Sequence, residues 1–242
     1  MIRVLSIGNS FSQDAQRYLH LIAQADGVEL KCVNLYIGGC SLSTHYKHMH
    51  NDAKAYRFEF NGENTNIFVT MKEGLQSDDW DYITFQQVSG ESPRFETYTP
   101  YLEALSDYAK LHAPKSKQLL HQTWSYEQGS ERLNQLGYQD QKEMFHDVKA
   151  AYEQAKRTIQ AEGIIPSGAC MQHLLENGLK TVHRDAFHAD LGVARYAIAL
   201  TWYGFLTGND LQANALRNFD QPISEEELEL AKKSAMQALE KN

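Results

Sequence analysis

The sequence predicts a single α/β domain, spanning residues 1–242, around a parallel β-sheet. Short apolar runs alternate with longer amphipathic stretches, which is the pattern of βαβ units. No linker rich in proline, glycine or serine divides the chain, and hydrophobic residues make up 42% of it. These observations favour one ordered domain with a sizeable core over two small domains or a disordered chain.

The short apolar runs are the expected strands, and the longer amphipathic stretches are the expected helices. Five runs predict strands at Ile2–Ile7, Lys31–Tyr36, Tyr82–Phe85, Gln118–Gln122 and Gly163–Ile165. Six stretches predict helices at about Gln13–Asp26, Leu42–His50, Thr99–His112, Gln141–Glu162, Ala189–Thr207 and Ser224–Glu240. Ser224 followed by Glu227 is a capping-box pattern, which marks the start of the last helix.

The segment Tyr56–Met71 interrupts this alternation. Polar and apolar residues alternate on both sides of Asn61-Gly62, which is a strong short-range signal of a β-hairpin. We expect a small antiparallel insertion there, outside the main sheet. For the five other strands we expect a flavodoxin-like three-layer sandwich with a five-stranded parallel sheet of order 2-1-3-4-5, in which ligands bind beyond the carboxyl ends of the strands. Residues that carry chemistry should therefore follow a strand directly.

Charge and cysteine content exclude several classes of protein. The 31 acidic and 23 basic residues give a formal charge of −8, which argues against nucleic-acid partners. The three cysteines, Cys32, Cys40 and Cys170, have no CxxC spacing, so neither a disulfide framework nor a zinc ribbon is expected. No signal-peptide pattern and no apolar run of membrane-spanning length is present. We therefore expect no membrane contact and a cytoplasmic location, unless a leader has been removed.

The first candidate for chemistry is Ser10, in the string Ile7-Gly8-Asn9-Ser10-Phe11-Ser12. This string joins the first expected strand to the first expected helix, where Gly8 permits a tight turn and amide N–H groups point outward. Such a position exposes a hydroxyl and lets main-chain amides stabilise an oxyanion. The alternative is that Ser10 and Gln13 form an N-terminal cap, or that the loop binds phosphate without chemistry.

The candidate base and its orienting group are His188 and Asp185, which precede an apolar helix. Three residues apart in the first helical turn, they would share one face, so the carboxylate could hold the imidazole Nδ1–H. His183 is a competing base, and Asp185 could instead be a helix cap. The fifth strand lies about 14 Å from the first in the expected order, but the segment Pro166–Arg184 is long enough to bring His188 back across the sheet.

These blocks, in this order, resemble the SGNH/GDSL hydrolases. They are G-N-S-F-S after the first strand, Gly38-Gly39 after the second, a polar amide after the third and DxxH near the C-terminus. The resemblance implies an acyl-serine mechanism, with Ser10 as nucleophile, His188 as base and Asp185 as its orienting group. It also implies that the amides of Ser10 and Gly39 form the oxyanion hole.

The chain departs from the family pattern at two places. Asn9 stands where an aspartate usually precedes the serine, and Gln86-Gln87 replaces the GxND block. A glutamine carries the same amide donor as asparagine, so we expect Gln87, rather than Gln86, to complete the oxyanion hole. Asn9, Gln86 and Trp124 are candidate substrate-binding residues. The resemblance to a bacterial subfamily with GNSFS and QQ makes carbohydrate esters the expected substrates.

Other polar and aromatic residues have simpler interpretations. His45, His48 and His50 do not share one helical face, so we expect no metal, and no other cofactor is predicted. Cys40 lacks a local base and is expected to be a buried filler. Trp124 and Tyr126 follow the fourth strand, where they either stack on a sugar ring or lie in the core.

Three hypotheses remain from the sequence. The first is an esterase or deacetylase acting on a small or carbohydrate ester, and its rival is a non-catalytic module that binds phosphate or sugar. The third is a partner-binding protein that docks another subunit through the last helix, although such an apolar stripe more often packs on its own domain. The sequence leaves the oligomeric state, the acyl group and the alcohol open.

Overall fold

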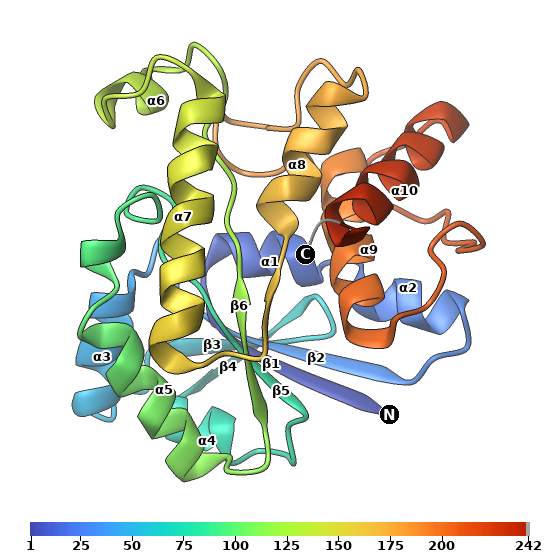
Figure 1. Ribbon diagram of the computed structural model, residues 1–242. Coiled ribbons are helices and arrows are strands. Elements are labelled where there is room, and N and C mark those ends of the chain that lie inside the picture. Colours follow the sequence, from blue (N-terminus) through green and yellow to red (C-terminus); the bar gives the residue numbers. More distant parts are fainter. Residues whose placement is uncertain (241–242) are drawn as a thin grey trace.

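Seven strands form one sheet in the computed structural model, which describes residues 1–240 (Figure 1). The spatial order is β4-β3-β2-β1-β5-β6-β7, and the five strands from β2 to β7 are parallel. Their bounds are β1 Ile2–Gly8, β2 Leu30–Tyr36, β3 Tyr56–Phe60, β4 Glu63–Val69, β5 Tyr82–Phe85, β6 Lys117–His121 and β7 Gly163–Ile165. The five expected parallel strands therefore agree with the structure to within one residue at each end.

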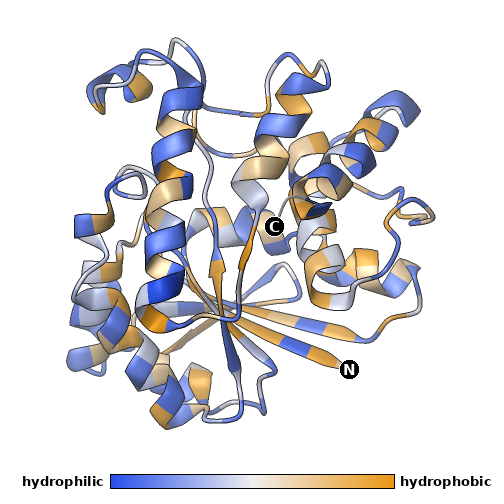
Figure 2. Cartoon of the chain, in the orientation of Figure 1, coloured by the Kyte–Doolittle hydropathy of each residue, from blue (hydrophilic) through white to orange (hydrophobic). Residues whose placement is uncertain are grey.

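Helices cover both faces of the sheet, which makes a three-layer α/β structure (Figures 1 and 2). One face carries α3 (Leu42–His50), α4 (Met71–Leu75), α5 (Tyr101–His112) and α7 (Gln141–Ile159). The other carries α1 (Ser10–Gln16), α2 (Leu19–Ala25), α8 (Ser167–Glu176), α9 (Val193–Thr207) and α10 (Glu225–Glu240). The short helix α6 (Glu131–Gln135) and the 3₁₀ turn η1 (Phe95–Thr97) lie in connections.

The central strand β1 shows why the sheet is covered on both sides. Val4 contributes to the core under α9, whereas Leu5 and Ile7 contribute to the opposite core, and all three are fully buried. A strand buried on both faces reads as a continuous apolar run rather than an alternating one. Its carboxyl end leads directly into α1, so whatever follows β1 lies at the middle of the sheet edge.

The expectation of a five-stranded sheet with a separate hairpin is wrong, because the hairpin joins the sheet. β3 pairs antiparallel with β2, and β4 pairs with β3. Asn61 and Gly62 connect the two strands with φ of 50° and 80°, the signs required by a type I′ turn. Without β3, one edge of β2 would leave its backbone donors and acceptors unpaired, and the hairpin satisfies them.

The outer strand β4 is irregular and partly apolar. Its pairing with β3 shifts register between Phe58 and Glu59, and Asn66 adopts a left-handed conformation with φ of 59°. Ile67 and Phe68 remain exposed on this strand. The sheet therefore ends in a bent strand rather than a flat one.

Helix boundaries differ from the predicted ones at three places. The expected helix Gln13–Asp26 is two helices, α1 and α2, separated where the buried Tyr18 donates its hydroxyl to Leu191 O. The expected connection Pro166–Arg184 contains α8, and α9 begins at Val193 rather than Ala189. Amphipathic patterns do not show breaks between two segments that bury the same face, which explains the first difference.

The C-terminal helix packs on its own domain. Ser224 Oγ accepts a hydrogen bond from Glu227 N while the Glu227 carboxylate accepts from Ser224 N, so the predicted capping box is confirmed. Leu228, Ala231 and Ala235 are buried in the same core as α9. The stripe considered above as a docking surface is thus covered by α8 and α9. No helix among residues 1–240 is long and apolar enough to cross a membrane.

The contact between α9 and α10 gives a stability test. A β-carbon at Gly204 of α9 would lie 2.6 Å from Leu239 Cδ1 and 3.2 Å from Leu211 Cδ2. Gly204→Val should therefore lower the free energy of unfolding by about 1–3 kcal/mol, as overpacking does. Urea unfolding measures the effect. Adding Leu239→Ala should recover part of the loss, and an equal loss in both backgrounds would mean that α10 does not lie here.

Candidate active site

The turn between β1 and α1 presents the Ser10 hydroxyl without using it as a cap. Asn9 is the N-cap, because its side-chain Oδ1 accepts a hydrogen bond from Phe11 N and its backbone N–H donates one to Ser12 Oγ. A β-carbon at Gly8 would collide with the Ser12 side chain, so only glycine fits there. The alternative in which Ser10 caps the helix is therefore excluded by the Asn9 contacts.

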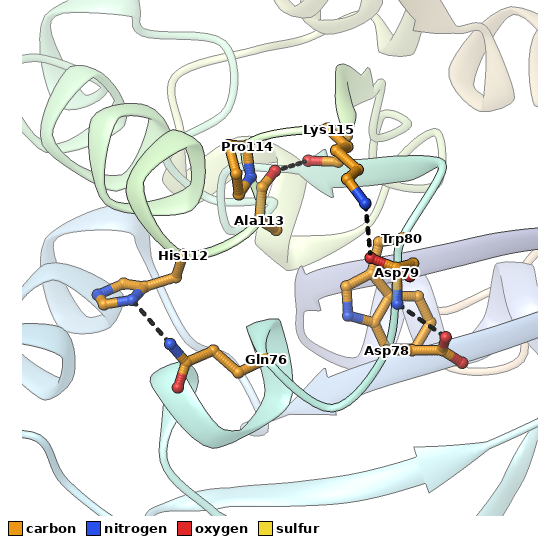
Figure 3. Close-up of a pocket in the computed structure, with 9 residues that line it drawn as sticks. Gln76, Asp78, Asp79, Trp80, His112, Ala113, Pro114 and Lys115 are labelled. Carbon is orange, nitrogen blue, oxygen red and sulfur yellow. Dashed lines mark hydrogen bonds and ion pairs between the residues drawn. The ribbon is translucent and has the colours of Figure 1, made fainter.

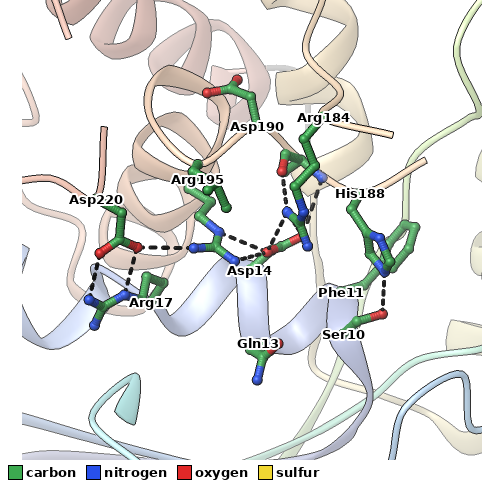
Figure 4. A network of polar contacts seen from close by, with 12 residues as sticks. Ser10, Phe11, Gln13, Asp14, Arg17, Arg184, His188, Asp190, Arg195 and Asp220 are labelled. Atoms are coloured by element: carbon green, nitrogen blue, oxygen red, sulfur yellow. Dashed lines mark hydrogen bonds and ion pairs between the residues drawn. The ribbon is translucent and has the colours of Figure 1, made fainter. Parts of the chain in front are cut away.

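Ser10, His188 and Asp185 lie in one hydrogen-bonded line, shown in part in Figure 4. Asp185 Oδ2 lies 2.7 Å from His188 Nδ1, so Nδ1 carries the proton and donates it. His188 Nε2 then accepts from Ser10 Oγ at 2.8 Å. The structure thus brings together two segments 178 residues apart in a geometry that suits proton transfer.

The Asp185 carboxylate is held as an anion by its histidine. Partial burial acts to raise the pKa of Asp185, but hydrogen bonds from the His188 side chain and backbone outweigh burial and leave that pKa below its ordinary value. Asp185 Oδ1 also accepts from His188 N at 2.9 Å. Both carboxylate oxygens are therefore committed to the same residue, which fixes the imidazole in orientation and tautomer.

The segment that carries Asp185 and His188 is a loop and not the first turn of a helix, as the sequence suggested. An isolated bridge between His183 and Ala189 closes it, and Ala186 has a φ of 71°. A left-handed alanine costs about 1–2 kcal/mol, so the surrounding contacts must hold the loop in shape. The competing base His183 is buried, with its Nε2 3.0 Å from Ser125 O, and does not face Ser10.

A buried carboxylate on α1 fixes this loop against Ser10 (Figure 4). Asp14, one turn after Ser10, is fully buried and accepts hydrogen bonds from Arg184 Nη1 and from Ala189 N. Arg195 of α9 binds the same carboxylate through Nε at 2.8 Å. Arg184 and the Ala189 amide therefore tie both ends of the His188 loop to the helix that carries Ser10, and Arg195 adds α9 to the same carboxylate.

Two amides are placed to stabilise an oxyanion. Ser10 N and Gly39 N have no hydrogen-bond partner among residues 1–240, and both residues line the cavity in front of Ser10. Gly39 adopts a φ of 62° in the turn after β2, where a β-carbon would meet no neighbour but would strain the backbone. The resemblance implied that these two amides would donate to an oxyanion, and both face the cavity unpaired within residues 1–240.

Gln87 does not supply the third donor that was expected. Its Nε2 donates to the Thr97 carbonyl and hydroxyl, and its Oε1 accepts from Leu42 N and Val88 N. The side chain is fully buried and holds the start of α3 against the loop after β5. The expectation failed because alternation along a strand gives the side of the sheet on which a residue lies, but not the partners of a long side chain after the strand ends.

Gln86 and Asn9 form a buried polar chain behind the nucleophile. His121 Nδ1 donates to Gln86 Oε1 at 2.7 Å, and Gln86 Nε2 donates to Asn9 Oδ1 at 2.6 Å. Asn9 Nδ2 then donates to Cys40 O, which joins the Ser10 turn to the Gly39 turn. Gln86 lies outside the lining of the cavity and positions the turns, whereas Asn9 lines the cavity with its amide already committed.

Trp124 is a core residue rather than a sugar platform. Its ring is fully buried and stacks on Phe11 with centroids 4.1 Å apart, while its Nε1 donates to Phe187 O. Tyr126, in contrast, lines the cavity. Trp124 therefore supports Phe11 and Phe187, the neighbours of Ser10 and His188, from beneath.

The cavity in front of Ser10 has a volume of about 480 Å³ and lies at the carboxyl ends of the parallel strands. A second cavity of about 530 Å³ lies at the opposite ends of β5 and β6, lined by Asp79, Trp80 and Lys115 among others (Figure 3). An ion pair joins Lys115 to Asp79 there. The serine and the histidine that line this second cavity are hydrogen-bonded elsewhere, Ser116 Oγ to Ala113 O and His112 Nδ1 to the Gln76 amide. Of these two cavities, only the first is lined by a serine and a histidine that are hydrogen-bonded to each other.

None of the three cysteines lines this first cavity, and neither do His45, His48 and His50. His45 is buried against Tyr56, and burial lowers the pKa of its imidazole to about 3. Cys40 is buried, which raises the pKa of its thiol to about 12. No group of three potential metal ligands occurs within the part of the chain that the structure describes.

The fold is that of the SGNH hydrolases and GDSL-like lipases. A putative SGNH hydrolase from Slackia heliotrinireducens aligns with a TM-score of 0.60 and 21% identity over 84% of this chain and 97% of that one. A putative GDSL-like lipase from Parabacteroides merdae aligns with a TM-score of 0.58 and 14% identity over 86% and 95%. At these identities the likeness shows the fold alone.

Within that fold class, the chain belongs to the DUF4886 family, described as a domain of unknown function, whose model matches residues 3–238. A DUF4886 protein from Bacteroides uniformis has a similar crystal structure, with a TM-score of 0.92 and 32% identity over 98% of this chain and 94% of that one. Comparison with curated proteins gives no significant match.

The buried carboxylate gives the first test of the site. Asp14→Ala should lower the free energy of unfolding by about 3–5 kcal/mol, because it leaves Arg184 without a counter-charge and removes one of the two carboxylates that bind Arg195. Asp107→Ala is the matched control, since the exposed pair of Asp107 with Lys110 should contribute less than about 1 kcal/mol. Similar losses in both variants, measured by urea unfolding, would mean that Asp14 does not hold the loop.

The buried His121 makes stability depend on pH. Burial lowers the pKa of its imidazole to about 3. Its Nε2 has no hydrogen-bond partner among residues 1–240, so an N–H group at Nε2 would have no acceptor there. Below the unfolded-state pKa of about 6.5, the unfolded chain binds a proton that the folded chain rejects. The free energy of unfolding is therefore unaffected by protonation of His121 above about pH 6.5. It falls as the pH is lowered toward 3, by up to about 1.4 kcal/mol per pH unit.

A variant separates His121 from the other titrating groups. The difference in unfolding free energy between the wild type and His121→Gln, measured from pH 7 to pH 4, should shrink as the pH falls, because glutamine does not titrate. A difference that stays constant with pH would show that folding does not change the pKa of His121.

Proposed function

We propose that the protein is a serine hydrolase that cleaves a small or carbohydrate ester through an acyl-serine intermediate. The observation that carries the proposal is the 2.8 Å hydrogen bond from Ser10 Oγ to His188 Nε2, with Asp185 on the other imidazole nitrogen. An imidazole so placed accepts the hydroxyl proton when the oxygen attacks a carbonyl carbon. Fold likeness to hydrolases agrees with this chemistry but does not identify the substrate.

In acylation, Ser10 Oγ bonds to the ester carbonyl carbon while its proton moves to His188 Nε2. The carbonyl oxygen becomes an oxyanion, to which the free amides of Ser10 and Gly39 would donate. Asp185 stabilises the resulting imidazolium without taking its proton. As the tetrahedral intermediate collapses, His188 returns the proton to the leaving alcohol, and the acyl group stays on Ser10.

In deacylation, a water molecule replaces the alcohol. His188 Nε2 takes a proton from this water as its oxygen attacks the acyl carbon, and the proton then returns to Ser10 Oγ as the carboxylic acid leaves. No step requires a metal or an organic cofactor. The rim residues Tyr36, Tyr126 and Phe187 offer aromatic surfaces for a sugar or a small acyl group, which is why carbohydrate esters remain the proposed substrates.

The proposal is tested by hydrolysis of p-nitrophenyl acetate. Ser10→Ala and His188→Ala should each lower kcat/KM at least about a thousand-fold, because each removes a member of one unit. Asp185→Asn should leave the nucleophile in place but allow the wrong tautomer, and the rate should again fall strongly. Wild-type rates in the Ser10 and His188 variants would remove the triad.

A fluorophosphonate probe distinguishes the rival function, a module that binds phosphate or sugar without chemistry. The probe should label Ser10 and leave Ser89 unlabelled, although Ser89 also lines the cavity, because the Ser89 hydroxyl is bonded to Tyr126 rather than to a base. Mass spectrometry of the labelled peptide locates the adduct. A native protein that takes up no probe would favour the binding module.

A further inference from the structure

The cavity in front of Ser10 differs in charge from the rest of the protein. The chain has 31 acidic and 23 basic residues, yet the residues lining this cavity include two arginines, Arg132 and Arg184, and no aspartate or glutamate. Asp185 lies close by, but both of its oxygens bind His188. The lining of the cavity therefore carries cationic side chains and no carboxylate, in a protein with a formal charge of −8.

The two arginines have different roles. Arg184 donates through Nη1 to both oxygens of Asp14 and to Ala189 O. Its charge is therefore paired with a buried carboxylate, and the side chain stabilises the loop that carries His188. Arg132, at the start of α6, is exposed and has neither a hydrogen bond nor an ion pair with any of residues 1–240. Of the two arginines that line the cavity, only Arg132 thus lacks an acidic partner within the described chain.

Most arginines of this protein do have an acidic partner. Among residues 1–240, Arg94 and Arg157, like Arg132, have no acidic partner, but neither of them lines the cavity. Arg157 lies on α7 and is exposed, which makes it a suitable reference for a cation away from the site.

Packing places the Arg132 guanidinium near the reacting groups. Its central carbon lies 4.0 Å from the centre of the Phe187 ring, and the Phe187 ring lies 3.9 Å from the imidazole of His188, centre to centre. The guanidinium is therefore within about 8 Å of the imidazole centre. A guanidinium stacked on a ring keeps its in-plane N–H groups free, and these match a carboxylate in a bidentate geometry.

We propose that Arg132 binds a carboxylate of the substrate, so that the preferred esters carry a negative charge close to the scissile bond. One unpaired guanidinium balances one negative charge, which suits a carboxylate better than a doubly charged phosphate. The carboxylate belongs either to the acyl group, as in a half-ester of a dicarboxylic acid, or to the alcohol, as in an acylated uronic acid. This inference rests on the proposed function, because it assigns a substrate class to the same site.

Matched substrate pairs test the inference on both sides of the ester. On the acyl side, mono-p-nitrophenyl glutarate is compared with p-nitrophenyl valerate. On the alcohol side, acetate release from an O-acetylated methyl glucuronoside is compared with release from the O-acetylated methyl glucoside. In at least one pair the wild type should show a kcat/KM about ten-fold higher for the charged ester, and added salt should weaken the preference.

Charge-removing variants then assign the preference to one residue. Arg132→Gln should lower kcat/KM for the charged ester about ten-fold and leave the neutral ester within about two-fold. Arg157→Gln removes the same charge elsewhere and should change neither. An equal effect of Arg132→Gln on both esters, or no preference for a charged ester in either pair, overturns the inference.

Binding separates this inference from the proposed function. If the wild type hydrolyses none of the four esters, the proposed function fails, but binding of mono-p-nitrophenyl glutarate and of the acetylated glucuronoside to Ser10→Ala can still be measured by calorimetry. Binding of either one that weakens about ten-fold when Arg132→Gln is added supports the anion site. Equal affinity in the single and double variants for both compounds, or no binding of either, contradicts it.

Discussion

The structure of the site depends on one buried carboxylate. Asp14 lies a single helical turn from Ser10, and it receives Arg184 and the Ala189 amide from the two ends of the His188 loop. A buried charge is costly unless it is paired, so the carboxylate requires these partners as much as they require it. The hydroxyl and the imidazole meet because the helix that carries the first also anchors the loop that carries the second.

Behind the nucleophile, a second polar group links the turns that provide the oxyanion amides. The chain from His121 through Gln86 to Asn9 and the Cys40 carbonyl runs through the core beneath the cavity. Buried polar networks fix a geometry when their members are hydrogen-bonded, and in this network only His121 Nε2 lacks a partner among residues 1–240. The turns that carry Ser10 and Gly39 are thus held in place by buried side chains behind the cavity.

Much of the fold could be predicted from the sequence because parallel strands buried on both faces read as apolar runs, as β1 and β7 do. That Ser10, His188 and Asp185 lie together could be predicted from the position of Ser10 after β1 and from the order of the family's motifs. The hairpin, recognised from Asn61-Gly62, was misplaced because periodicity does not show which edge a strand joins. Gln87 and Trp124 were misassigned because their roles depend on partners, Thr97 and Phe187, that are remote in sequence. Asp14 gave no signal, since an acidic residue in a helix usually faces solvent.

The bend in β4 has a consequence for the protein in solution. A straight outer strand with Ile67 and Phe68 exposed would offer another molecule a ready row of N–H and C=O groups, the route by which sheets grow between chains. Asn66, held in the left-handed region, interrupts that row in its middle. An edge strand interrupted in this way is a poorer template for pairing with another chain than a straight strand with the same exposed apolar side chains.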